Sequence, residues 1–220
     1  KIKIGVAYYP ERWGEEMWES DAMRMKEAGI KVIRVAEFAW CKMEPEEGKF
    51  ELDWLVKVVN LFGSYGIKTI LCTPTNCAPL WLYEKYPETL QVQRDGKRMY
   101  PGVRGHRCYH SQIYRLFAER IIRKMCKVFA GNPNVAAWQI DNEVDAVFCC
   151  CDACAEKFRS WLKEKYGTVE EVNKAFGNEV WSGSYSAWTQ IKPPLGDRPL
   201  VQYNPAYLLD FQRFSSDGVV

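Results

Sequence analysis

The sequence predicts an α/β fold and, within that class, roughly the first half of a TIM (β/α)8 barrel. Three observations predict it. Short runs of β-type apolar residues alternate with amphipathic helical stretches, glycines at positions 29, 66 and 131 stand before successive strands, and the strands end in polar or aromatic residues. Alternating strands and helices call for a parallel sheet, because each connecting helix must pack back onto it.

The first three strands follow one another closely. The run Ile4–Tyr9 is apolar and aromatic and stops at a proline, whereas Glu16–Ala28 places its apolar residues at helical spacing. Lys31–Phe38 is rich in β-branched residues and is expected to be the second strand. Asp53 could cap a helix whose apolar residues stand at positions 55, 58, 59 and 62, and Lys68–Thr73 is the third expected strand.

A longer and less regular connection, Pro74–Tyr109, comes next. A loop of that length inside a compact domain usually contributes to function. The spacing of apolar residues from Ile113 to Met125 predicts a third helix. The remaining elements are expected to be a strand over Val135–Ile140, helices over Asp152–Tyr166 and Thr168–Phe176, an irregular stretch over Gly177–Asn204, and a last helix that opens at Asn204-Pro205.

Two parallel architectures compete for this pattern, the doubly wound sheet and the barrel. A doubly wound nucleotide-binding sheet should carry a Gly-rich phosphate loop after its first strand, and the sequence from Tyr8 to Arg12 has none. A barrel instead places functional residues at the carboxyl ends of its strands. Because a whole barrel takes about 250 residues, residues 1–220 are expected to be the N-terminal part of one catalytic domain, with strands one to four and the helices that follow them.

Composition excludes several classes of protein. The chain has 220 residues, of which 47% are hydrophobic and 26% charged, so a disordered or collagen-like chain is excluded. Lys+Arg total 30 and Asp+Glu 28, so the net charge is 30 − 28 = +2, and neither nucleic acid nor a membrane surface is expected as a partner. The chain opens at Lys1 without a Met or a leader pattern.

The nine cysteines cluster instead of spreading along the chain. Cys149, Cys150, Cys151 and Cys154 fall within six residues, whereas a disulfide framework would space its cysteines so that they join distant loops. We therefore expect a reducing, cytoplasmic compartment and a metal site.

The fourth strand ends in two carboxylates and an amide, Asp141-Asn142-Glu143. An Asn-Glu pair by itself is more often a helix cap with surface charge. At the carboxyl end of a barrel strand, however, a Glu can meet a substrate. Retaining glycoside hydrolysis needs two carboxyl groups about 5–5.5 Å apart, one of which protonates the leaving oxygen. Glu143 is the candidate acid/base, and Asn142 is the candidate ligand of a sugar hydroxyl.

The chain resembles family 42 of the glycoside hydrolases, the β-galactosidases of microbial cytoplasm. The resemblance covers most of the chain to about Tyr166. It is carried by Gly5–Pro10 with Trp13, by Arg34–Trp40 with Met43–Pro45 and Gly48–Phe50, and by Trp138–Glu143.

The resemblance implies a function and a set of site residues. The expected activity is retaining hydrolysis of terminal β-D-galactosyl residues, with Glu143 as acid/base and with Asn142 and Arg104 as ligands of the galactosyl group. The family's nucleophile is a glutamate on the seventh strand, so these 220 residues are expected not to contain it and to be inactive alone. The resemblance also suggests a homo-oligomer, a trimer, as the assembled protein.

Two further readings concern Glu37 and the aromatic residues. Glu37 could line the floor of the pocket and support the sugar or a catalytic neighbour, or it could form a buried ion pair with Arg34 or Arg104. As a group, the rings of Trp40, Trp81 and Tyr83 could stack on a sugar.

The thiol cluster suits structural Zn²⁺. Cys149, Cys151 and Cys154 supply three thiolates near a helix start, and Cys108 can supply the fourth from the preceding loop. The family resemblance supports the same four cysteines, which many members of the family carry and others lack. Three alternatives stay open: Cys150 takes the place of Cys149 or Cys151, His106 or His110 replaces a thiolate, or the thiols bind no metal and merely sit together.

Two other functions stay open at this stage. A related barrel hydrolase that acts on β-mannan or β-glucan would share the Asn142-Glu143 pair, and a non-catalytic carbohydrate-binding module would share the fold without the chemistry.

Overall fold

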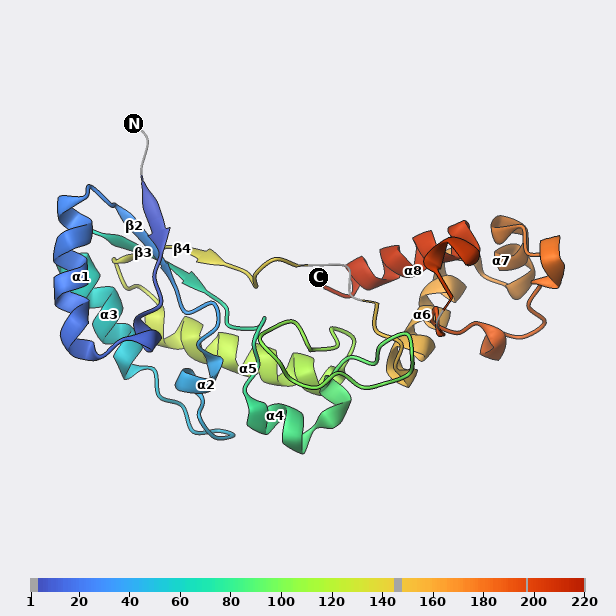
Figure 1. Ribbon diagram of the computed structural model, residues 1–220, viewed down its shortest axis with the longest axis horizontal. Helices are drawn as coiled ribbons and strands as arrows, with labels where there is room; N and C mark the ends of the chain where they lie inside the picture. Colours follow the sequence, from blue (N-terminus) through green and yellow to red (C-terminus); the bar gives the residue numbers. More distant parts are fainter. Residues whose placement is uncertain (1–3, 145–147, 197, 220) are drawn as a thin grey trace. The chain divides into compact units, whose positions relative to one another are not determined.

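The computed structural model describes residues 4–144, 148–196 and 198–219, which form two compact units (Figure 1). The sheet unit contains residues up to 87 together with 103–105 and 116–143, and the helical unit contains 88–102, 106–115 and the described residues from 144 onward. The assignment of residues 1–220 to one catalytic domain stays a prediction.

The sheet has four parallel strands in the order in which they occur along the chain: β1 (Gly5–Ala7), β2 (Val32–Val35), β3 (Lys68–Cys72) and β4 (Val135–Gln139). A doubly wound sheet reverses its strand order at a switch point, whereas a barrel adds each strand beside the previous one. The expected α/β fold and the beginning of a barrel are therefore confirmed.

The strands are shorter than the apolar runs that predict them. Beyond Ala7, the chain turns into a 3-10 helix, η1 (Pro10–Arg12), because Pro10 has no N–H to donate to a neighbouring strand. Beyond Val35, Ala36 has φ 76°, outside the range of extended backbone, so β2 ends there. The residues released from the strands, Tyr9 and Glu37 among them, are free to carry polar side chains at this edge of the sheet.

The sheet unit contains the three predicted helices, α1 (Glu15–Glu27), α3 (Asp53–Ser64) and most of α5 (Gln112–Phe129). Helix α3 packs against α1 and β3. The expected role of Asp53 as the helix cap is wrong: Leu52 occupies the cap position without a side-chain hydrogen bond, and Asp53 lies in the first turn. A carboxylate there still interacts favourably with the positive end of the helix dipole.

Besides η1, three short helices in the described residues before α5 were not predicted from the sequence. They are α2 (Trp40–Met43), α4 (Leu80–Lys85) and η2 (Pro87–Thr89), the last two within the connection that was expected to be irregular. Each is too short to show a helical period in its apolar residues.

The helical unit is built on α6 (Asp152–Tyr166), α7 (Val169–Phe176) and α8 (Pro205–Asp217), all at their predicted positions. The side chain of Asn204 caps α8, and that of Thr168 caps α7. The stretch expected to be irregular contains three 3-10 turns, η3 (Val180–Ser182), η4 (Trp188–Gln190) and η5 (Leu200–Gln202).

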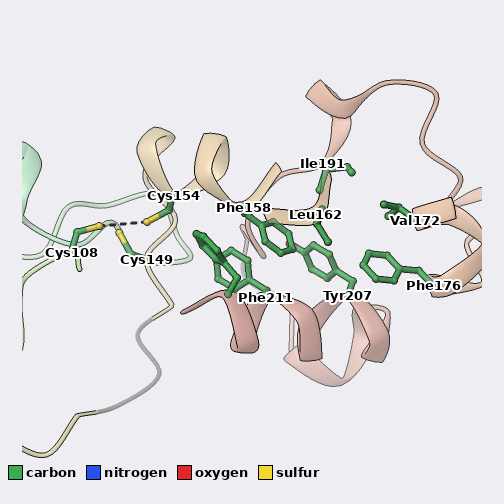
Figure 2. Packing of buried hydrophobic residues seen from close by; sticks show 11 residues of the cluster. Cys108, Cys149, Cys154, Phe158, Leu162, Val172, Phe176, Ile191, Tyr207 and Phe211 are labelled. Atoms are coloured by element: carbon green, nitrogen blue, oxygen red, sulfur yellow. Dashed lines mark hydrogen bonds between the residues drawn. The ribbon is translucent and has the colours of Figure 1, made fainter. Parts of the chain in front are cut away.

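Aromatic rings from α6 and α8 form the core of the helical unit. Figure 2 shows Phe158 of α6 facing Phe211 and Tyr207 of α8, with Cys108, Cys149 and Cys154 at one end of the same buried cluster. The rings of Phe158 and Phe211 meet edge to face, with centroids 4.9 Å apart.

In the described part of the chain, no helix has both the length and the apolar character needed to cross a membrane.

A buried carboxylate joins α6 to α8. The Asp210 side chain is 2% exposed and accepts hydrogen bonds from Lys165 Nζ at 2.6 Å, from Tyr166 OH at 2.7 Å and from Arg213 Nη1 at 3.1 Å. Burial alone would raise the pKa of Asp210, but the hydrogen bonds from Lys165, Tyr166 and Arg213 lower it below its usual value. The ionised carboxylate therefore stabilises the packing of the two helices.

Asp210→Asn should lower the free energy of unfolding by roughly 2 kcal/mol at neutral pH, because Lys165 and Arg213 lose their counter-charge. The pKa of Asp210 is lowered in the folded state, so its contribution is complete above the unfolded-state pKa of about 3.9 and is lost as the pH falls through the folded-state pKa. Denaturant unfolding at several pH values measures both effects.

The matched control is Lys174→Gln, which breaks an exposed pair with Glu171 at 3.9 Å and should change stability by less than about 0.5 kcal/mol. The difference in unfolding free energy between Asp210→Asn and the unchanged protein should shrink as Asp210 becomes protonated. A difference that stays the same down to the pH of full protonation would contradict the role of the Asp210 charge.

Candidate functional site

Polar residues gather where β3 and β4 end. Thr73, Thr75 and Asn76 follow β3 and are buried, as are Asp141 and Asn142 after β4. Parallel pairing of β3 with β4 brings these two segments to one edge of the sheet, and hydrogen bonds join them: the Asp141 backbone N–H donates to Thr73 Oγ1 at 2.7 Å, and Asn76 Nδ2 donates to the Asn142 backbone oxygen at 2.6 Å.

The segment Asp141–Glu143 has an unusual backbone. Asp141 has φ 53° and Glu143 has φ 44°, both in the left-handed region that residues with a Cβ atom rarely occupy. Such residues persist where the surrounding structure fixes them, and they cluster at functional sites. Besides the two bonds above, the Asn142 backbone N–H donates to Asp141 Oδ1 at 2.7 Å.

Glu143 and Arg104, two of the predicted site residues, lie in direct contact. Arg104 Nη2 is 2.5 Å from Glu143 Oε2, and the Arg104 guanidinium lies 5.8 Å from the centre of the Phe38 ring. The side chains are 44% and 67% exposed, so water screens the pair and it adds little to stability. Both groups are therefore accessible to a ligand from solution.

Asn142 lies beside this pair but is buried. Its Oδ1 accepts a hydrogen bond from Gln139 Nε2 at 3.4 Å, and the same nitrogen donates to the Asp141 backbone oxygen at 2.9 Å. Since the oxygen of the Asn142 amide faces Gln139, its nitrogen is the end that can donate to an incoming hydroxyl.

Glu37 forms the buried ion pair with Arg34 that was one of its two expected roles. Its carboxylate is 3% exposed and lies 2.9 Å from Arg34 Nε, and Tyr9 OH also donates to it, which raises the pKa of Tyr9. Arg34 Nη1 donates to Gln139 Oε1 at 3.2 Å. Hydrogen bonds thus connect Glu37 through Arg34 and Gln139 to Asn142, and Arg104 pairs with Glu143 instead of Glu37.

Two of the three aromatic residues expected as a sugar-stacking group, Trp40 and Tyr83, are buried, and Trp81 is partly exposed. Trp40 is fully buried and donates to Glu44 Oε2 at 3.0 Å, Trp81 donates to the Glu44 backbone oxygen at 2.9 Å, and Tyr83 is 3% exposed. The buried rings of Trp40 and Tyr83 are not accessible to a sugar, and the partly exposed Trp81 ring packs edge to face on Phe117 at 5.6 Å, so the three rings do not form the expected stacking group. Phe38, next to Arg104, is an aromatic neighbour of the site that the sequence pattern did not single out.

The four predicted metal-ligating thiols come together in the helical unit. The Sγ atoms of Cys108, Cys149, Cys151 and Cys154 all lie within 4.8 Å of one another, with Cys108 Sγ 3.4 Å from that of Cys154 and 3.9 Å from that of Cys151. Cys151 is the N-cap of α6, and its sulfur accepts a hydrogen bond from the Cys154 N–H. Hydrogen bonds from Cys108 and its neighbours lower the pKa of Cys151.

Among the described residues, the four grouped thiols are separate from the other candidate ligands. The sulfur of Cys150 is not among the four grouped atoms, burial raises the pKa of its thiol to about 12, and its N–H donates to the Val92 backbone oxygen at 2.8 Å. His106 Nε2 accepts the Gly102 N–H at 2.7 Å, and the His110 ring stacks on Phe214 at 4.1 Å. Neither histidine joins the group of four sulfurs.

The spacing of the sulfurs fits a tetrahedral metal site. Four sulfurs each about 2.3 Å from a zinc ion would be about 3.8 Å apart, close to the separations above. All nine cysteines of the chain are free, so none of these sulfurs is committed to a disulfide. The four thiols could therefore fill all four coordination positions of a tetrahedral metal ion.

Comparisons with known proteins find similarity along almost the whole chain. A family model described as beta-galactosidase, that of glycoside hydrolase family 42, matches residues 7–220. The beta-galactosidase BgaA of Clostridium cellulovorans is 54% identical over 219 residues, which cover 100% of this chain and 33% of that protein. A beta-galactosidase of Thermus thermophilus is 42% identical over 98% of this chain and 34% of its own.

The solved structures give the same result. A polyextremophilic beta-galactosidase from the haloarchaeon Halorubrum lacusprofundi superposes with a TM-score of 0.94 at 40% identity, over 99% of this chain and 33% of that one. The chain therefore spans about a third of the length of the relatives it matches.

Proposed function

This chain belongs to glycoside hydrolase family 42, described as beta-galactosidase, and on that premise we propose that the full-length protein containing it hydrolyses terminal β-D-galactosyl residues with retention of configuration. One observation carries the proposal: the contact of Arg104 with Glu143 at the carboxyl edge of a parallel sheet, with Asn142 beside it. Beta-galactosidase is also what the relatives' names state of those proteins.

In the proposed reaction, Glu143 protonates the glycosidic oxygen as the bond to the anomeric carbon breaks. A nucleophilic carboxylate, which the family resemblance assigns to a glutamate on the seventh strand, takes the galactosyl group as a covalent intermediate. Glu143, now ionised, then accepts a proton from the water that releases galactose. Two displacements at one carbon give net retention.

Arg104 and Asn142 orient the sugar in this scheme. A guanidinium has five N–H donors, so Arg104 can bind galactosyl hydroxyls and contact the Glu143 carboxylate at the same time. The Asn142 amide nitrogen, directed away from Gln139, donates to a sugar hydroxyl. A hydrogen bond there that strengthens in the transition state adds several kcal/mol to catalysis.

We propose that the four thiols bind one structural Zn²⁺. Zinc held by Cys108, Cys149, Cys151 and Cys154 would have a closed coordination shell and would contribute folding energy instead of acid catalysis. The four thiolates join the loop that carries Cys108 to the start of α6. Nine free cysteines also support a reducing compartment, the cytoplasm, as the proposed location. The expected homo-oligomer stays a prediction.

Glu143→Gln in the full-length protein should reduce hydrolysis of a galactoside with a poor leaving group, such as lactose, by 10²-fold or more, because the leaving oxygen receives no proton. The first step with an activated dinitrophenyl galactoside needs little protonation and should be nearly unchanged in a burst experiment. Glu119→Gln, an exposed helix carboxylate, is the control. Equal losses on both substrates would contradict the acid assignment.

Arg104→Ala should raise KM for galactosides about 10-fold or more, because it removes charge-assisted hydrogen bonds to the substrate. Arg123→Ala removes an arginine of similar charge that is 77% exposed and paired with Glu119, and it should leave KM unchanged. Steady-state kinetics compare the two variants. The same KM for both would refute a substrate-binding role for Arg104.

Purified protein should contain close to one zinc per chain by elemental analysis. Cys151→Ser should lower both the zinc content and the melting temperature, since it removes one of four ligands. Cys126→Ser, which replaces an exposed cysteine outside the cluster, should change neither. Metal-free protein with an unchanged melting temperature would rule out the zinc site while leaving the hydrolase proposal in place.

A further inference from the structure

We propose that Asn76 is the positioning residue that holds Glu143 and Arg104 in their mutual orientation; this inference rests on the proposed function. Asn76 is the fourth residue after β3 and is 4% exposed. Its Nδ2 donates to the Asn142 backbone oxygen at 2.6 Å, and its own backbone oxygen accepts the Gly105 N–H at 3.3 Å. One residue thus contacts both segments that carry the candidate site.

Each of these hydrogen bonds acts on the peptide plane next to a site residue. The Asn142 oxygen lies in the plane that includes the backbone nitrogen of Glu143, so fixing that oxygen restrains φ of Glu143. The Gly105 N–H lies in the plane that begins at Arg104, so fixing it restrains ψ of Arg104. Backbone angles set the direction of the Cα–Cβ bond, so residue 76 restrains the base of both side chains: its amide acts on Glu143 and its backbone oxygen acts on Arg104. Only the contact that acts on Glu143 depends on the Asn76 side chain.

The restraint matters because Glu143 is in a conformation that its backbone does not favour. At φ 44°, Glu143 would relax toward negative φ if the Asn142 peptide plane were free to turn. The Thr73 hydroxyl and the Asp141 carboxylate hold the two preceding backbone nitrogens, and Asn76 holds the carbonyl that leads directly into Glu143. Loss of the Asn76 amide thus loosens the position of the acid more than that of Asn142.

The test replaces the Asn76 donor with an oxygen of the same shape. In the full-length protein, Asn76→Asp should lower kcat for lactose about 10²-fold, the typical result of misplacing a catalytic group by about 1 Å. The burst with a dinitrophenyl galactoside should fall less than about 5-fold, because that step does not need the acid. A merely structural defect would instead reduce the active fraction and lower both rates equally.

If Asn76→Asp folds poorly, a second variant provides the test. Asn76→Ala removes the donor without adding charge and should show the same difference between leaving groups. Combined with Glu143→Gln, either Asn76 variant should cause little further loss on lactose, since the acid it positions is already absent. Asn132→Asp, which removes an amide donor to Asn60 at 3.1 Å, should leave both rates unchanged.

The outcomes separate this inference from the proposed function. If Glu143→Gln shows the dependence on the leaving group and the Asn76 variants do not, Asn76 is not a positioning residue and the hydrolase proposal stands. If Glu143→Gln itself shows no such dependence, the proposed function fails and this inference fails with it. Additive losses in the double variants would also overturn the positioning role.

Discussion

The parallel pairing of four consecutive strands is the constraint on which the candidate site depends. Because β2, β3 and β4 run in the same direction and pair with one another, the segments that follow them meet at one edge of the sheet, although 37 and 143 are far apart in the sequence. The hydrogen bonds from Asp141 to Thr73 and from Asn76 to Asn142 exist only because the ladder brings their segments together. A slip of one residue between β3 and β4 would separate these partners and disassemble the site.

The two glutamates at this edge of the sheet, Glu37 and Glu143, have the same side chain but different surroundings and therefore different roles. The Glu37 carboxylate is buried, and Arg34 and Tyr9 occupy its oxygens, so it serves as a fixed anchor for the hydrogen bonds that lead to Asn142. Glu143 is 67% exposed, held by one accessible arginine, and open to a ligand. Breaking the Glu37 pair would leave a charge buried without a partner, whereas rearranging the Glu143 pair on binding costs little.

The sequence predicted the elements whose evidence is local. The apolar face of α3 and the asparagine that caps α8, Asn204, can each be recognised within about a dozen consecutive residues, and both were correctly placed. Helix α2 has four residues and shows no period, and the end of β2 depends on the backbone of Ala36. At the site, the strand-end motif and the family resemblance indicated Glu143. Asn76 could not have been assigned, because one asparagine in a loop has no pattern and its contact partner is 66 residues away. Spacing likewise could not distinguish Cys150 from its neighbours, and only the three-dimensional arrangement leaves its sulfur outside the group of four.

The central claim is that Glu143 faces the glycosidic oxygen of a galactoside that Arg104 and Asn142 hold. A crystal structure of the full-length protein with an unhydrolysed galactoside tests it most directly. The account predicts a Glu143 carboxylate oxygen about 2.6–3.2 Å from the glycosidic oxygen, with the Arg104 guanidinium and the Asn142 amide nitrogen on hydroxyls of the same galactosyl ring. A galactoside bound elsewhere, or bound with the Glu143 carboxylate turned away from its glycosidic oxygen, would contradict the account.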